Sequence, residues 1–117
     1  MQMNENDISE EMVHYVLTLD TQELSTLTSQ KVAEVFGLNS KEVNRAFAST
    51  QELSLDQFIM REKMYRAFFI IERNSEISLN QLAREMGFYS LRDFEKEFET
   101  LLLIHPARYK ELFHVSH

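Results

Sequence analysis

The sequence predicts an all-α fold, and three observations support this prediction. First, the 117 residues include only two glycines and one proline, whereas Leu, Glu, Gln, Lys and Met, which favour helices, are common. Second, apolar residues recur at helical spacing between short polar segments that can begin a helix. Third, the chain repeats itself, because segment 31–40 matches segment 81–90 and the two glycines, Gly37 and Gly87, fall at the same place in both copies.

The repeat predicts two similar pairs of helices. The copies are 50 residues apart over segments 31–40 and 81–90 and 51 residues apart afterwards, where Val43 corresponds to Phe94 and Phe47 to Phe98. In each copy a short amphipathic helix ends at a glycine and is followed by a small polar residue and a second helix. This order is typical of a helix-turn-helix, so we expect two such units on one short chain.

Start and stop signals predict the individual helices. A first helix over about 8–19 is expected to begin near Asp7, because apolar residues keep a helical period there. Thr28 or Ser29 can cap the second helix, and Gly37 can supply the left-handed turn that ends it. Later helix starts carry polar pairs that resemble capping boxes: Asn39–Glu42, Ser54–Gln57 and Ser78–Gln81. The corresponding helices span about 39–49, 54–73, 78–87, 90–100 and 106–112, which makes about seven helices in all.

The length of the chain suits one compact domain, or two small lobes that share a linker helix. The expected segments are a flexible N-terminus (1–7), a first helix-turn-helix subdomain (8–53), a linker helix (54–74), a second helix-turn-helix subdomain (75–113) and a tail (114–117).

Composition limits the classes of function. The net charge of −7 is unfavourable for a nucleic-acid partner, which usually meets a basic face. However, residues 1–30 hold six acidic residues and no Lys or Arg, so the remainder is nearly neutral and a local basic face is compatible with the total. No apolar run approaches the ~20 residues that cross a bilayer, and no signal peptide is recognisable. We therefore expect a cytoplasmic protein without a membrane partner.

Catalytic and metal-binding patterns are missing from the sequence. It has no cysteine, no Gly-rich phosphate loop, no nucleophile–base pair at a suitable spacing and no cofactor motif. His114 and His117 are three residues apart but have no third ligand nearby, and His14 and His105 are isolated in the sequence. We therefore expect no enzyme activity, no cofactor and no metal site.

The second half of the chain carries a specific motif: Ile77-(x4)-Leu82-Ala83-(x3)-Gly87-Phe88-(x5)-Phe94-(x3)-Phe98-(x7)-Pro106-(x2)-Tyr109. The first half carries a looser version: Ala33-(x3)-Gly37, Val43-(x3)-Phe47, Phe58-Ile59, and Lys63 with Ala67. Together these motifs cover about residues 8–112 and resemble the AraC/XylS family of bacterial transcription regulators. In that family the DNA-binding domain consists of two helix-turn-helix subdomains joined by a long helix.

The resemblance implies that double-stranded DNA is the partner and that recognition involves no catalysis. The third and sixth helices of such a domain enter successive major grooves, ~34 Å apart along B-DNA, and the linker helix sets that spacing. The residues at the implied DNA-facing positions are Lys41, Asn44 and Arg45 on the third helix, Leu91, Arg92 and Lys96 on the sixth, and Ser29 and Ser78 at helix N-termini that can meet phosphates. Arg can bond guanine, Asn can read adenine, and Leu can contact a thymine methyl group.

The sequence departs from the family pattern in two ways. Glu52 and Leu103 follow the two recognition helices where many members have Gly, so these turns are expected to close differently here. The sixth helix also carries more acidic than basic residues: Asp93, Glu95, Glu97 and Glu99 against Arg92 and Lys96. Because fewer phosphate contacts reduce electrostatic affinity, we expect weak non-specific binding and a second reading helix that contributes less than the first.

Two interpretations of the function stay open. The first is a sequence-specific DNA-binding domain of an AraC-type regulator. The second is an AraC-like fold that has lost strong DNA affinity and acts as a protein–protein interaction module, which the acidic sixth helix and the acidic N-terminal segment favour. Lys41, Arg45, Arg92 and Lys96 aligned on one face without acids between them would favour DNA, whereas intervening acids would favour the interaction module.

Further partners are suggested by the linker helix, which is apolar around its circumference rather than along one stripe. The lobes and the first helix can cover this excess, or it can be a docking face. The candidate occupants are RNA polymerase, a second copy of the chain, and an effector-binding or dimerisation domain missing from this chain. The resemblance is compatible with a short freestanding member and with the C-terminal part of a longer regulator.

Overall fold

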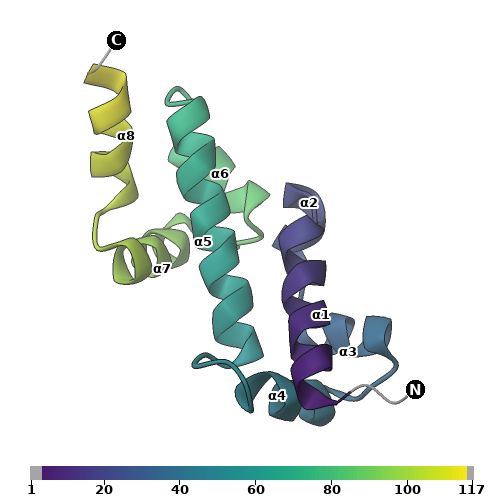
Figure 1. Cartoon of the computed structure of the whole chain (residues 1–117). Helices are drawn as coiled ribbons and strands as arrows, with labels where there is room; N and C mark the ends of the chain where they lie inside the picture. Colours follow the sequence, from purple (N-terminus) through teal and green to yellow (C-terminus); the bar gives the residue numbers. More distant parts are fainter. Residues whose placement is uncertain (1–3, 116–117) are drawn as a thin grey trace. The chain divides into compact units, whose positions relative to one another are not determined.

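The computed structural model describes residues 4–115, which form eight helices and no strand (Figure 1). The predicted all-α class is therefore confirmed for this part of the chain. The helices are α1 (Glu5–Thr18), α2 (Thr21–Ser25), α3 (Ser29–Phe36), α4 (Ser40–Ala48), α5 (Leu55–Arg73), α6 (Leu79–Glu85), α7 (Leu91–Leu102) and α8 (Pro106–Val115). Positions 1–3 of the expected N-terminal segment, positions 116–117 of the expected tail and the side chain of His114 lie outside the described residues.

The chain divides into two compact units, residues 1–62 and 63–117, and α5 contributes residues to both. Each unit contains one of the two predicted helix pairs. In the first unit α3 and α1 pack against α4, and in the second unit α7 packs against both α6 and α8.

Apolar side chains from five helices form the core of the first unit. Met12 and Val16 of α1 are fully buried with Val43 and Phe47 of α4. The ring of Phe58, from the start of α5, lies 5.3 Å from the ring of Phe47. The residues of this core are Met12, Val16, Leu24, Leu27, Val32, Ala33, Val43, Ala46, Phe47, Leu55, Phe58 and Ile59.

Aromatic side chains dominate the core of the second unit. Phe94 and Phe98, one turn apart on α7, have no exposed surface. Tyr109 of α8 is stacked on Phe68 of α5 with the ring centroids 4.2 Å apart, and its ring lies 6.3 Å from that of Phe98. Because each of these rings is held on several sides, α7 has one strongly preferred rotation about its axis.

The turn between α3 and α4 forms as the sequence predicts. Gly37 has φ 67°, the left-handed conformation that favours glycine. The N–H of Leu38 donates to the carbonyl of Ala33 at 2.9 Å, which closes the end of α3. Asn39 then caps α4 and forms the predicted capping box with Glu42.

The turn between α6 and α7 repeats this geometry with one additional residue. Gly87 has φ 85°, and the N–H of Phe88 donates to the carbonyl of Ala83 at 2.9 Å. Ser90 caps α7 by accepting a hydrogen bond from the N–H of Asp93. Tyr89, which lies between the glycine turn and this cap, is fully exposed. It has no counterpart before α4, so it accounts for the change of offset from 50 to 51 residues.

Several predicted helix boundaries were wrong. The first helix begins at Glu5, because Asn4 caps it, and not near Asp7. The last helix continues to Val115, beyond the predicted end at Leu112 and into the segment assigned to a tail. The additional helix is α2, which raises the number from about seven to eight among the described residues.

The turn after α7 contradicts the expectation that it closes differently without glycine. Leu103 has φ 62° and ends α7 in the left-handed conformation, with its N–H donating to the carbonyl of Glu99. It is the one non-glycine residue with a positive φ among residues 4–115. Glu52 does not adopt this conformation, and α4 ends at Ser49 in a right-handed turn, so the expectation is confirmed there.

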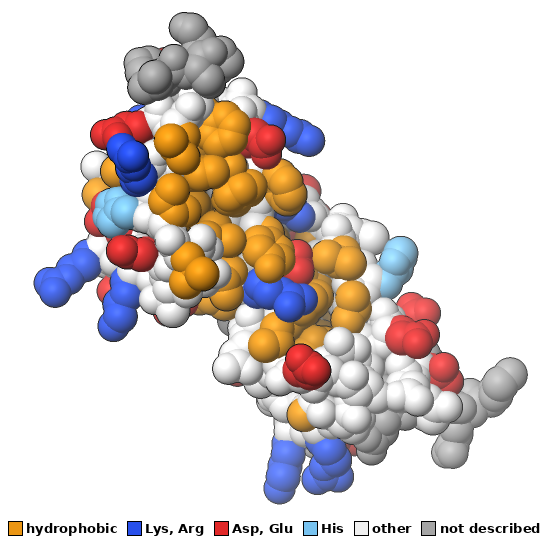
Figure 2. All heavy atoms as spheres, turned by 60° about the vertical axis from the view of Figure 1, so that its left-hand side comes forward, with side chains coloured by type: hydrophobic (Ala, Val, Ile, Leu, Met, Phe, Trp, Pro, Cys, Tyr) orange, Lys and Arg blue, Asp and Glu red, His pale blue; other side chains and the backbone are white. Residues whose placement is uncertain are grey.

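Part of the apolar surface of the second unit is exposed. Tyr65 and Phe69 on α5 and Leu112 on α8 are each at least 40% exposed, although Met64 and Ala67 are fully buried. Figure 2 shows hydrophobic side chains gathered beside the C-terminal end of α8. None of the helices in residues 4–115 is long and apolar enough to cross a membrane.

Replacing Leu103 by glycine is expected to stabilise the protein. A left-handed conformation brings Cβ close to the following carbonyl oxygen, at a cost of about 1–2 kcal/mol that glycine does not incur. Leu103 is 87% exposed, so its removal loses little packing. We expect Leu103→Gly to raise the free energy of unfolding by about 1 kcal/mol in urea titrations followed by circular dichroism. Leu101→Gly, inside α7, should lower it by about 1 kcal/mol, and a loss of stability in Leu103→Gly would contradict the strain argument.

Alkaline pH is expected to destabilise the protein through Tyr109. Burial, together with the nearby carboxylate of Glu72, raises the pKa of Tyr109 from 10.0 to about 12. Below pH 10 the phenol is protonated in the folded and unfolded chains alike, and this contribution to stability is complete. Between pH 10 and 12 the unfolded chain loses the proton first, so stability falls by on the order of 2 kcal/mol.

This pH dependence can be isolated by comparing unfolding free energies of the natural protein and Tyr109→Phe between pH 8 and pH 12. As the pH rises from 10 to 12, the free energy of unfolding of the natural protein should fall relative to that of Tyr109→Phe, which has no phenol to ionise at this position. Tyr89→Phe is the matched control, because Tyr89 is fully exposed and the substitution should leave the pH profile of the natural protein unchanged. Parallel profiles for the natural protein and Tyr109→Phe would disprove the assignment.

Candidate nucleic-acid interface

The solvent-facing side of α4 is formed by Lys41, Asn44, Arg45 and Ala48, which we call the α4 stripe. Their spacing of three and four residues places them on one face, opposite the buried Val43. Lys41, Arg45 and Ala48 are exposed and Asn44 is half-buried. The stripe carries two positive charges and no carboxylate.

The acidic residue of α4 is held away from this stripe. Glu42 follows Lys41 in sequence, but its side chain accepts a hydrogen bond from the backbone N–H of Asn39 at 3.1 Å as part of the capping box. Its carboxylate therefore neutralises part of the positive partial charge at the N-terminus of α4 instead of pairing with Arg45.

The side-chain amide of Asn44 makes one hydrogen bond within the protein and still has groups available for a partner. Its amide nitrogen donates to the backbone carbonyl of Ser40 at 2.8 Å. Because a side-chain amide has two N–H hydrogens and one carbonyl oxygen, one hydrogen and the oxygen are still available. These are the two groups that a bidentate contact with adenine uses.

The equivalent face of α7 has a different charge pattern. At an offset of 51 residues the stripe becomes Arg92, Glu95, Lys96 and Glu99, which we call the α7 stripe. Phe94 and Phe98 are buried as Val43 and Phe47 are in α4, so the two stripes are equivalent in their helices. Arg92, Lys96 and Glu99 are exposed, Glu95 is half-buried, and the formal charge of the stripe is zero.

Glu95 contacts His105, a histidine that is isolated in the sequence. The Nε2 atom of His105 lies 3.2 Å from a carboxylate oxygen of Glu95. The Nδ1 atom of the same ring accepts a hydrogen bond from the backbone N–H of Ala107 at 3.1 Å, in the first turn of α8. Since Nδ1 is an acceptor, a neutral ring carries its proton on Nε2, the atom that faces Glu95.

The two serines predicted to face phosphates have other partners. Ser29 is the buried first residue of α3, its hydroxyl donates to the carboxylate of Asp56 on α5, and the N-cap of α3 is Thr28. Ser78 is the N-cap of α6, and its hydroxyl accepts a hydrogen bond from the N–H of Gln81 at 3.1 Å. The hydroxyl hydrogen of Ser29 is therefore engaged within the protein, whereas the exposed Ser78 hydroxyl can still donate its hydrogen to a phosphate. The backbone N–H groups at both helix starts, on which the prediction rests, are not tested by these contacts.

The remaining predicted contact, Leu91, is the first residue of α7 and is half-buried. In α4 the same position is occupied by Ser40. Part of the leucine side chain is therefore accessible for an apolar contact, while the rest contributes to the packing of α7.

The two helices differ in whether an acidic residue lies between the basic residues of the stripe. No acid lies between Lys41 and Arg45 on the α4 stripe, which is the pattern expected for contact with DNA. On the α7 stripe Glu95 lies between Arg92 and Lys96, which is the pattern expected for the interaction module. The electrostatic case for DNA binding therefore rests on α4.

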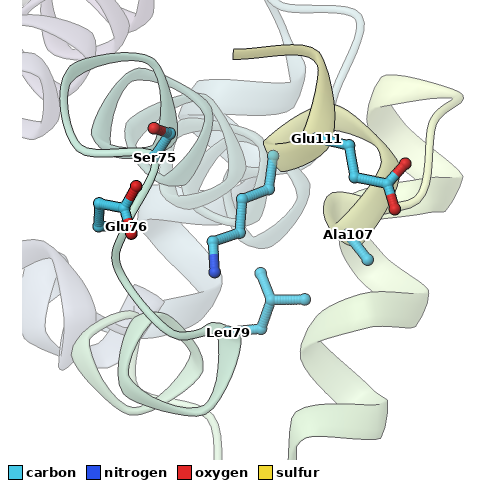
Figure 3. A pocket seen from close by; sticks show the side chains of 6 residues that line it. Ser75, Glu76, Leu79, Ala107 and Glu111 are labelled. Atoms are coloured by element: carbon cyan, nitrogen blue, oxygen red, sulfur yellow. The ribbon is translucent and has the colours of Figure 1, made fainter. Parts of the chain in front are cut away.

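A separate hollow of about 380 Å³ lies in the second unit. Figure 3 shows that its labelled side chains come from the connection before α6 (Ser75 and Glu76), the start of α6 (Leu79) and α8 (Ala107 and Glu111). Lys110 completes the lining. No residue of either stripe contributes to it, and no group of three or more potential metal ligands occurs among the residues that the structure describes.

Three solved structures share the fold over most of their length. The C-terminal domain of AraT, a response regulator from Geobacillus stearothermophilus, has a TM-score of 0.77 and 19% identity, covering 90% of this chain and 84% of that one. The C-terminal domain of the two-component response regulator yesN from Fusobacterium nucleatum has a TM-score of 0.73 and 19% identity, covering 86% of this chain and 95% of that one. A DNA-binding transcriptional dual regulator from Escherichia coli K-12 has a TM-score of 0.71 and 17% identity, covering 98% and 96%.

These likenesses confirm the predicted fold, which this chain shares with the three regulator domains. At identities of 17–19% the likeness is one of fold. The sequence matches no protein-family model and no curated protein.

Proposed function

We propose that this chain is a sequence-specific DNA-binding domain of a bacterial AraC-type transcription regulator, with α4 and α7 as its two reading helices. The observation that carries the proposal is the α4 stripe. Two exposed cations and one half-buried amide lie on a single face of α4 in the first helix-turn-helix unit, and no carboxylate interrupts them. The fold shared with solved regulator domains supports it.

The side chains of the α4 stripe supply the chemistry that base recognition needs. The planar guanidinium of Arg45 can donate two hydrogen bonds to O6 and N7 of guanine, and Asn44 can contact adenine. Lys41, one turn earlier at the N-terminal end of the helix, is suited to a phosphate contact. Phosphate contacts fix the register of the helix, and contacts with base edges read the sequence.

In this proposal the two reading helices enter major grooves one turn of B-DNA apart, ~34 Å, and α5 joins the units that carry them. The activity is recognition in the cytoplasm, with no chemical step and no cofactor. RNA polymerase, a second copy and an effector-binding or dimerisation domain are the further partners that such a regulator would use.

The second candidate function is a protein–protein interaction module that keeps the fold without strong DNA affinity. The carboxylates of Glu95 and Glu99 on the α7 stripe favour it, because they oppose the approach of α7 to phosphates. The excess of acidic residues in positions 1–30 has the same effect.

Substitutions on the two stripes should separate base reading from phosphate binding. In fluorescence anisotropy with the best duplex from a randomised pool, Arg45→Ala should weaken binding about tenfold, because a bidentate contact with guanine is worth about 1–3 kcal/mol. Lys96→Ala should weaken binding of all duplexes by a similar factor and lower the salt slope by about 1. Arg108→Ala, which removes an exposed cation on α8, is the matched control and should change neither.

The natural protein decides between the two candidate functions in the same experiment. Enrichment of a site with two half-sites one turn apart, bound more weakly by both Arg45→Ala and Lys96→Ala, would support the proposed function. Failure of the folded natural protein to bind any duplex at low salt would overturn it and favour the interaction module.

Removing the exposed carboxylate of Glu99 should strengthen DNA binding without changing its sequence preference. Glu99 lies on the α7 stripe one turn beyond Glu95, where it repels phosphates. We expect Glu99→Gln to bind all duplexes a few-fold more tightly at low salt, with the gain disappearing as salt is added. Glu111→Gln, an equally exposed site on α8, should leave the affinity unchanged. An unchanged affinity in Glu99→Gln would show that this end of α7 does not approach DNA.

A further inference from the structure

We propose that Glu95 determines base specificity in the second lobe by accepting a hydrogen bond from the N4 amine of cytosine, and that His105 positions its carboxylate for this contact. The inference rests on the proposed DNA-binding function and adds what the α7 stripe reads. It explains why a carboxylate occupies the face of α7 that would meet DNA.

The position of Glu95 follows from the internal repeat. Phe94 and Phe98 are buried in the second unit as Val43 and Phe47 are in the first, so α7 presents the same face as α4. Glu95 is the equivalent of Asn44, which has a free amide oxygen and a free N–H on the α4 stripe. The repeat therefore places Glu95, whose carboxylate only accepts hydrogen bonds, where the first unit has the amide of Asn44.

The contact with His105 limits where this carboxylate can point. One oxygen of Glu95 lies 3.2 Å from Nε2 of His105, while Nδ1 of the ring is bonded to the N–H of Ala107. The imidazole thus contacts both α7, at Glu95, and the first turn of α8, at Ala107. The second carboxylate oxygen is left to accept another hydrogen bond, and less rotational freedom is lost when it does so.

An acceptor in this position selects among the four bases. In the major groove guanine presents two acceptors and thymine presents an acceptor beside a methyl group, so neither can donate to a carboxylate. Adenine offers its N6 amine, but the neighbouring N7 acceptor repels a second acceptor. Cytosine offers its N4 amine without an acceptor beside it. Glu95 therefore favours cytosine.

The neighbouring cations reduce the electrostatic penalty of bringing a carboxylate to DNA. Arg92 and Lys96 lie three residues before and one residue after Glu95 on the same exposed stripe, where they can meet phosphates on either side. Because the stripe is neutral overall, α7 adds discrimination between sequences with little non-specific affinity.

Selection of duplexes from a randomised pool at low salt, followed by sequencing, tests the inference. The natural protein should enrich cytosine about tenfold at one position of the second half-site. Glu95→Ala should make that position degenerate and leave the others unchanged. Glu95→Gln should change the preference there from cytosine to adenine, because an amide can both donate to N7 and accept from N6.

Glu99→Gln is the matched control, since it removes the same charge from the same stripe without changing the residue that reads the base. It should increase binding to all duplexes and keep the cytosine preference. If Glu95→Gln behaves like Glu99→Gln, Glu95 acts through charge alone and the inference is wrong. If the natural protein selects a site in which no position depends on Glu95, the inference fails while the proposed function survives. If it selects no site, both fail.

The role of His105 is tested by His105→Asn. Asparagine can still cap α8 but cannot reach Glu95 in the same way, so thermal stability should stay close to that of the natural protein. The cytosine preference should weaken several-fold at the single position that Glu95 reads. A uniform loss at every position of the site would mean that His105 has a structural role and does not position Glu95.

Discussion

Burial of two apolar side chains one turn apart on α4, and of two more on α7, determines which face of each helix is exposed. Phe94 and Phe98 have no exposed surface in α7, and Val43 and Phe47 are equally enclosed in α4. Burying a phenylalanine side chain contributes about 1.5–3 kcal/mol, so turning either helix by one residue would cost several times the thermal energy. The α4 and α7 stripes are therefore defined by the cores behind them.

The elements that could be predicted from the sequence are those specified by residues close together in the chain. Gly37 ends α3 in a left-handed conformation, which glycine adopts readily because it has no Cβ. Asn39 caps α4 by accepting a hydrogen bond from the N–H of Glu42, three positions away. The same reasoning could have found α2, since Asp20 and Glu23 form a complete capping box. However, that helix has only five residues, which is too few for a repeating apolar pattern that would predict a helix.

The features that could not be predicted involve residues brought together by folding. Ser29 and Asp56 are 27 positions apart, and no periodicity links them, yet their contact removes the serine hydroxyl from any partner. His105 likewise reaches Glu95 only because the chain turns back after α7, and that turn depends on Leu103 adopting a conformation usually left to glycine. A pattern of residue types cannot show that a leucine will tolerate this strain, because the packing on either side of the turn decides it.

The acidic character of the second lobe is compatible with a reading function once affinity and specificity are treated separately. In the proposed function, cations on the α4 stripe would attract every duplex equally, so they would raise non-specific and specific binding together. On the same proposal, a carboxylate on the α7 stripe would lower the affinity for every duplex, and would lower it less where a base can donate a hydrogen bond to it. Since a regulator must find one site among a large excess of competing DNA, the ratio of the two affinities matters more than either alone. In the proposed function, a neutral α7 stripe combined with a basic α4 stripe would raise that ratio, at the expense of total affinity.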